Sequence, residues 1–158
     1  MPETPEYLSE RLKNEGEKTL AFFAGLTPEQ WHTEVYTEGE HWTVRSVLAH
    51  YLTAERGFIK IYKDILSGGE GASADFDIDR YNASQQAKNK DSSPAELMEQ
   101  FKQVRAEMTA FVASLTEADL QTEGRHPYLG MTTLAEMVKM IYRHNQIHHR
   151  DLRSLSND

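Results

Sequence analysis

The segment VRSVLAHYLTAERGFIKIYKDIL, residues 44–66, decides the fold of this chain. Its apolar residues recur at intervals of three and four, the spacing that places them on one face of an α-helix. Thr43 stands where a helix N-cap is expected, and the glycine-containing stretch 67–71 ends the pattern. The segment therefore predicts a long amphipathic helix whose apolar face must be covered by other elements. That face comprises Val44, Val47, Leu48, Tyr51, Leu52, Phe58, Ile59, Tyr62 and Ile65.

Three further long helical patterns accompany this one, at about residues 6–25, 94–115 and 134–154. Each of them also repeats apolar residues every three or four positions, although the first does so imperfectly. The last two begin with the spacing of a capping box, in which the first side chain bonds the backbone three residues later. Those pairs are Ser93 with Glu96 and Thr133 with Glu136.

The remaining segments predict only short elements. Residues 27–31 and 116–120 have the pattern of capped turns, and residues 79–88 predict a short helix with Asp79 as its cap. No stretch of four or more residues alternates as a strand does. The sequence therefore predicts an all-α fold, a four-helix bundle formed by a single domain over residues 1–158. The long connection between the second and third helices makes simple up-and-down connectivity less certain than the number of helices.

Composition excludes some classes of function and location. The chain has no cysteine, so neither a disulfide nor a protein thiolate contributes to its chemistry. Its net charge of −8 argues against a nucleic-acid partner, because such proteins usually carry a basic patch. No apolar run is long enough to span a membrane, and the N-terminal sequence lacks the order of a signal peptide. We therefore expect a cytoplasmic protein with no nucleic-acid or membrane partner.

The histidines point to a metal site. His144 and His148 are four residues apart, so they lie about 40° apart around the helix and on its apolar face. His50 lies at the edge of the apolar face of the 44–66 helix. Three imidazoles and an open coordination position describe a catalytic rather than a structural metal site. Hydrogen-bonded core histidines remain the alternative, and His149 is turned about 100° away, so we expect it to flank the group.

Other polar residues carry weaker signals. Glu55 lies in the apolar stripe, where a salt bridge to an arginine of another helix is favoured over a role as metal-ligand partner or proton acceptor. Arg80 and Asn82 are candidates for binding an anionic part of a substrate, with surface solvation as the alternative. Trp31, Trp42 and Tyr128 are interpreted as packing residues.

Several motifs together resemble the DinB-like (YfiT-like) family of metalloenzymes. These are HWTVRSVLAHYLTAERGF (residues 41–58), GMTTLAEM (residues 130–137) and RHNQIHHRDL (residues 143–152). The order of parts matches the family: a tryptophan, a histidine midway along the second helix, and H-x-x-x-H on the last. The resemblance covers almost the whole chain and implies a divalent metal held by His50, His144 and His148.

The resemblance also implies a class of reaction. Characterised relatives include transferases that use a low-molecular-weight thiol such as bacillithiol or mycothiol, and mycothiol-dependent maleylpyruvate isomerases are more distant. A divalent metal, with zinc or nickel favoured and iron as another option, would favour the thiolate of an incoming thiol. We therefore expect transfer of a thiol onto an electrophilic small molecule, and a homodimer as in many relatives. A metal-dependent hydrolase and a non-enzymatic stress-response or ligand-binding protein remain alternatives.

Overall fold

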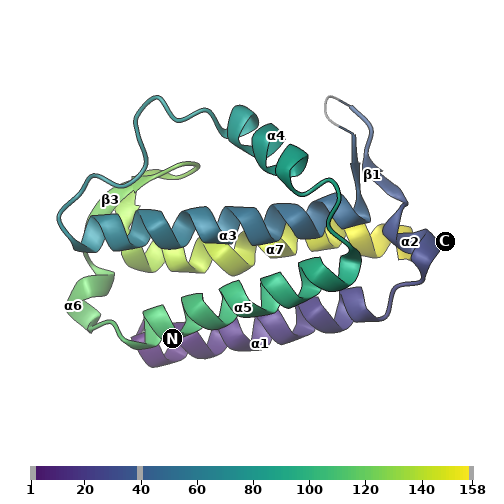
Figure 1. Ribbon diagram of the computed structural model, residues 1–158. Coiled ribbons are helices and arrows are strands. Elements are labelled where there is room, and N and C mark those ends of the chain that lie inside the picture. The colour runs from purple at the N-terminus through teal and green to yellow at the C-terminus, as the bar shows by residue number, and fades with distance from the viewer. Residues whose placement is uncertain (1–2, 39–40, 157–158) are drawn as a thin grey trace.

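Each of the four long amphipathic patterns forms a helix in the computed structural model, which describes residues 3–38 and 41–156. The long helices are α1 (Pro5–Ala24), α3 (Val44–Leu66), α5 (Pro94–Ala113) and α7 (Leu134–Ser156). Short helices α2 (Pro28–Trp31), α4 (Ile78–Lys88) and α6 (Glu117–Leu120) lie in the connections. The strands are β1 (Glu34–Tyr36), β2 (Trp42–Thr43), β3 (Glu123–His126) and β4 (Gly130–Thr133). The predicted helical bundle is confirmed (Figure 1).

Side-chain caps fix where the helices begin. Thr43 accepts a hydrogen bond from the backbone of Ser46 and starts α3, as predicted. Ser93 likewise caps α5. The short helix α4 differs from the prediction, because Asp77 rather than Asp79 caps it. The structure thus starts this helix one residue earlier, and Asp79 falls in its first turn.

The order of the long helices around the bundle differs from a simple up-and-down arrangement. Helices α1 and α3 each pack against both α5 and α7, so consecutive long helices α1 and α3 lie across a diagonal. Arg56 of α3 contacts Gln100 of α5, and seven residues later in both helices Lys63 contacts Glu107. The two neighbouring helices are therefore parallel. The long connection containing α4 returns the chain to the end where α3 began (Figure 1).

The core lies where the apolar stripes of the four helices meet. Its largest fully buried side chains include Tyr51, Tyr62, Phe23 and Phe101. The stripes cover one side of each helix and leave the other polar. In residues 3–38 and 41–156, accordingly, no helix is both long and apolar enough to cross a membrane.

Two short antiparallel pairs of strands accompany the helices and were not predicted from the sequence. Strand β1 pairs with β2, and β3 pairs with β4 in a hairpin. Gly130 has a φ of 74°, a conformation that glycine adopts easily, at the start of β4. The strands were missed because they pair through their backbones, and neither EGRH nor GMTT alternates apolar with polar residues. The hairpin carries His126 and Tyr128 to the side of the histidine pair on α7.

Candidate metal centre

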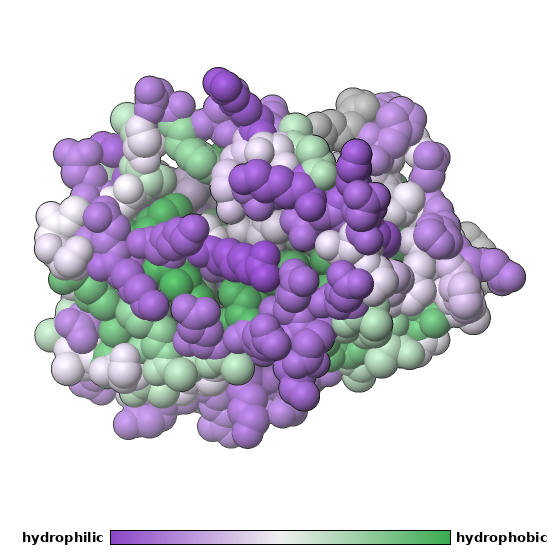
Figure 2. Space-filling view, in the orientation of Figure 1, coloured by the Kyte–Doolittle hydropathy of each residue, from purple (hydrophilic) through white to green (hydrophobic). Residues whose placement is uncertain are grey.

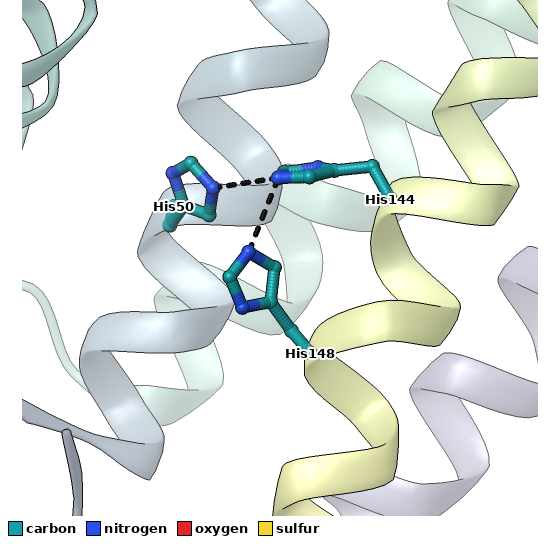
Figure 3. A group of neighbouring side chains, drawn as sticks. All are labelled: His50, His144 and His148. Carbon is teal, nitrogen blue, oxygen red and sulfur yellow. Dashed lines mark hydrogen bonds between the residues drawn. The ribbon is translucent and has the colours of Figure 1, made fainter.

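His50, His144 and His148 converge between α3 and α7 (Figure 3). The Nε2 atom of His144 lies 3.0 Å from Nε2 of His50 and 3.1 Å from Nε2 of His148. One ring nitrogen from each residue lies within 4.8 Å of the others. Helices α3 and α7 pack antiparallel, with Tyr51 bonded to Asn145 and Tyr62 to Met137, which places His50 opposite the pair on α7. His144 and His148 are one turn apart on the same face of α7.

The imidazoles of His50 and His144 are buried, that of His148 is half-buried, and all three are uncharged at neutral pH. His50 is 3% exposed and His144 is 8% exposed. Burial, assisted by the neighbouring histidines, lowers the pKa of His50 to about 2 and that of His144 to about 3. Burial also lowers the pKa of His148. Each ring therefore has one N–H and one nitrogen lone pair, the form in which histidine binds metals.

The contacts within the cluster are better suited to a bound cation than to hydrogen bonds alone. Nε2 of His144 faces two other Nε2 atoms but carries at most one proton, which cannot align with both contacts. Nitrogen ligands of tetrahedral zinc, with bonds of about 2.0–2.1 Å, lie roughly 3.3 Å apart. The two separations from Nε2 of His144 are close to that value, and all three ligand nitrogens lie within 4.8 Å of one another, so the residues fit a divalent metal.

A hydrogen-bonded chain fixes the orientation of His148. The Tyr36 hydroxyl lies 2.7 Å from Nδ1 of His148 and donates to a carboxylate oxygen of Asp151 at 2.6 Å. Burial and the bond to Asp151 raise the pKa of Tyr36, so the phenol keeps its single proton. Because that proton points to Asp151, Nδ1 of His148 must donate to the Tyr36 oxygen. The lone pair of His148 is therefore on Nε2, directed into the cluster.

Aromatic rings enclose the three imidazoles. The Trp42 ring centroid lies 4.9 Å from that of His50, and the Tyr128 ring stacks on His144 at 5.8 Å. Tyr51 contacts His144 and His148 edge-on or tilted, and its hydroxyl donates to the backbone oxygen of Asn145. Trp42 and Tyr128 were interpreted as packing residues, and what they pack against is the histidine cluster. These rings exclude water and thereby strengthen electrostatic interactions inside the cluster.

His126 is a residue near the cluster that the sequence did not indicate. It is 1% exposed, and burial lowers its pKa to about 4. Its Nδ1 accepts hydrogen bonds from the backbone N–H groups of Tyr128 and Leu129. Its Nε2 therefore carries the proton, and in the described part of the chain this buried nitrogen has no hydrogen-bond partner. The residue was missed because it lies in the hairpin, where no periodic pattern marked it.

The other residues singled out in the sequence occupy different places. Glu55 forms a buried salt bridge with Arg105 of α5, as favoured from the sequence, and takes no part in the cluster. His149 is half-buried and packs its ring edge against Phe22 of α1, flanking the cluster as expected. Arg80 is exposed on α4. Asn82 lines a cavity together with Tyr128.

The sequence matches the DinB superfamily over residues 11–152. No curated protein sequence matches this chain significantly. Among solved structures, the chain is similar to YfiT from Bacillus subtilis, described as a probable metal-dependent hydrolase with an unusual four-helix bundle topology. The two share 22% identity with a TM-score of 0.78, over 97% of this chain and 86% of YfiT. At that identity the similarity establishes the fold.

Two other solved structures share this fold with different functions. The mycothiol-dependent maleylpyruvate isomerase is 15% identical, with a TM-score of 0.77, over 96% of this chain and 61% of the isomerase. The colibactin self-resistance protein ClbS is 12% identical, with a TM-score of 0.77, over 100% of this chain and 98% of ClbS, and was crystallised in complex with a dsDNA.

The ClbS complex corrects one expectation from the sequence. The net charge of −8 argues against a nucleic-acid partner, and the expectation of no such partner is wrong, since a protein of this fold is seen with dsDNA. Net charge is a sum over the whole chain, whereas a nucleic acid meets only one face of a protein. The family match covers most of the sequence, and the chain belongs to the DinB superfamily.

Proposed function

We propose that His50, His144 and His148 hold a divalent metal and that the protein transfers a low-molecular-weight thiol, of the bacillithiol or mycothiol type, onto an electrophilic small molecule. The observation that carries the proposal is the convergence of three uncharged imidazole nitrogens within 4.8 Å in a largely buried setting. When bound, a divalent metal such as zinc, nickel or iron supplies positive charge that stabilises a thiolate. The chain has no cysteine, so a thiolate must come from outside the protein.

The residues of the chain have separate parts in this proposal. The three Nε2 atoms bind the metal, and Tyr36 with Asp151 keeps the His148 lone pair directed at it. Trp42, Tyr51 and Tyr128 keep water from the imidazoles, so that a charge at the centre is weakly screened. The fold shared with a mycothiol-dependent isomerase supports the use of a thiol.

Metal binding should raise thermal stability, and His148→Ala should abolish the increase. At a free metal concentration of 100 Kd the folded state gains about 2.7 kcal/mol, which for a chain of this size corresponds to roughly 5–10 °C in Tm. The measurement is differential scanning fluorimetry of untagged protein, metal-stripped and reloaded, with metal content checked by elemental analysis. His149→Ala is the matched control, because His149 is the adjacent histidine outside the cluster. Equal melting of loaded and stripped wild-type protein would refute the metal site.

Tyr36→Phe should weaken metal binding about 10- to 100-fold, since it removes the group that orients His148. Chelator competition measures the affinity, and ¹⁵N NMR of the metal-free protein reports which nitrogen of His148 carries the proton. In wild type the proton should be on Nδ1, whereas in the variant both tautomers should be populated. Tyr7→Phe, which removes a phenol hydroxyl on α1 far along the sequence from the cluster, should change neither result. Unaltered affinity in Tyr36→Phe would show that the hydroxyl has no orienting role.

The thiol requirement separates this proposal from its main alternative. Cobalt-loaded protein should change its visible absorption when bacillithiol or mycothiol is added, and consumption of a generic electrophile should depend on thiol, metal and protein together. A metal-dependent hydrolase is the second candidate, favoured by the description of YfiT as a probable hydrolase. Turnover of an activated ester that requires metal but not thiol would support the hydrolase and exclude the transferase.

A further inference from the structure

We propose that a cavity between α3, α4 and the β3–β4 hairpin binds a flat, uncharged, apolar group of the substrate. The cavity has a volume of about 290 Å³ and is walled by side chains of Phe58, Ile61, Phe76 and Ile78. Figure 2 shows apolar side chains in a hollow bordered by polar ones, between α3 and the connection to α4. That the bound apolar group belongs to a substrate rests on the proposed function. That the cavity binds such a group does not depend on it.

The lining determines the chemical class of the ligand. Lys60, which is exposed, is the only lysine, arginine or carboxylate residue among the described residues that line the cavity. A carboxylate or phosphate placed among the phenylalanine and isoleucine side chains would lose its water without gaining a partner. An uncharged group instead gains from the burial of apolar surface, at about 25 cal/mol per Å². Aromatic walls formed by Phe58 and Phe76 also suit a planar ring.

The construction of α3 keeps the cavity open. Gly57 lies in the interior of this helix, where glycine is less favourable than alanine by about 1 kcal/mol. A Cβ at this position would lie 3.1 Å from the Tyr81 hydroxyl. That hydroxyl donates to the backbone oxygen of Thr53 at 2.9 Å and so ties α4 across α3. The small residues Gly57 and Ala54 therefore line the α3 side of the cavity, and α4 lines the opposite side.

The cavity adjoins the histidine cluster at two points. Tyr128 lines the cavity and stacks its ring on His144, with the two planes 25° apart. Ala54 lies one helical turn after His50 on the same face of α3. A ligand seated in the cavity is thus separated from His144 by a single aromatic ring.

The volume limits the size of the bound group. An apolar cavity of about 150 Å³ binds benzene in another protein, so about 290 Å³ has room for roughly two fused rings. Tyr128 and Phe76 are 38% and 39% exposed, so the cavity is open at its rim and a longer molecule can extend outward. The substrate expected is an uncharged electrophile with an aryl or similarly flat apolar group.

A matched pair of fluorescent probes tests the cavity in metal-stripped protein. N-phenyl-1-naphthylamine is uncharged, and 8-anilinonaphthalene-1-sulfonate has the same rings with a sulfonate. The wild-type protein should bind the uncharged probe at one saturable site, at least tenfold more tightly than the sulfonate. Equal affinity for the two probes would overturn the assignment of an uncharged ligand, and the absence of saturable binding would overturn the site.

Substitution at the rim locates the binding. Ser73→Trp places a large ring at the mouth of the cavity and should weaken binding of the uncharged probe at least tenfold. Met131→Trp adds the same ring at a residue that is 63% exposed and outside the cavity, and should leave binding unchanged. Similar affinity in both variants would refute the location. Metal affinity, measured separately, should be unaffected in Ser73→Trp. If the wild-type protein binds the probe but no metal, the proposed function is refuted and the cavity assignment still holds.

Discussion

Acidification from pH 7 to pH 5 should reduce the free energy of unfolding of the metal-free protein by roughly 6 kcal/mol. The pKa values of His50, His144 and His126 in the folded protein are about 2, 3 and 4, all below the ordinary value of 6.5. As the pH falls below about 6.5, the unfolded chain takes up protons that the folded protein cannot accept. Stability is therefore complete above that pH and is lost progressively as the pH falls towards the folded pKa values. Each of the three histidines accounts for about 2 kcal/mol of the free energy lost at pH 5.

Urea denaturation at a series of pH values measures this loss. His126→Asn should reduce it by about 2 kcal/mol, because asparagine places an acceptor where Nδ1 receives two backbone N–H groups but does not titrate. His32→Asn is the matched control, since it makes the same substitution at an exposed histidine. An identical pH profile for His126→Asn and the wild type would contradict the prediction that buried His126 stays uncharged.

The same histidines show how much of the site is encoded locally. His144 and His148 could be placed together from the sequence because the helical repeat brings residues four apart onto one face. His50 could be added because its position at the edge of an apolar stripe directs it towards the other helices. Both inferences rest on helical periodicity, which a sequence displays directly. The clustering of the three nitrogens agrees with them.

Contacts that depend on how separate elements dock were not predictable in the same way. Tyr36 lies 112 residues before His148, and its contact with His148 and Asp151 requires the β1–β2 pair to sit against the end of α7. No local pattern marks such a contact. The β3–β4 hairpin and its residue His126 were not predicted for a related reason, because backbone pairing requires no alternation of apolar and polar side chains. The diagonal placement of α1 and α3 likewise results from the packing of whole helices.

The contact of Glu55 was predictable only in part: the sequence indicated the kind of partner but not which residue it is. Its position within an apolar stripe indicated that a buried acid would need a cationic partner, and an arginine of another helix was favoured. The partner is Arg105, which donates two hydrogen bonds of 2.8 Å to the carboxylate and a third, of 3.0 Å, to the backbone oxygen of Leu12. Gly16 gives the arginine side chain its space, because a Cβ there would lie 2.7 Å from Cγ of Arg105. The pair thus joins α1, α3 and α5.

Glu55→Gln should destabilise the protein by about 3–5 kcal/mol, since it leaves the guanidinium of Arg105 buried without its counter-charge. The side chains of Glu55 and Arg105 are 2% and 5% exposed, so water cannot replace the lost partner. The control joins the same two helices at the surface: Glu107→Gln removes an exposed ion pair with Lys63 and should cost less than about 1 kcal/mol.

Replacement of both partners separates the loss of a pair from the burial of a lone charge. In the double variant Glu55→Leu, Arg105→Met no charge is left in the core, and most of the stability lost in Glu55→Gln should return. Urea denaturation of the variants provides the comparison. If the double variant were as unstable as Glu55→Gln, the ion pair itself would be the stabilising element. Recovery would show that the buried ion pair gives little net stability compared with apolar packing at the same two positions, and that the loss in Glu55→Gln comes from the unpaired guanidinium of Arg105.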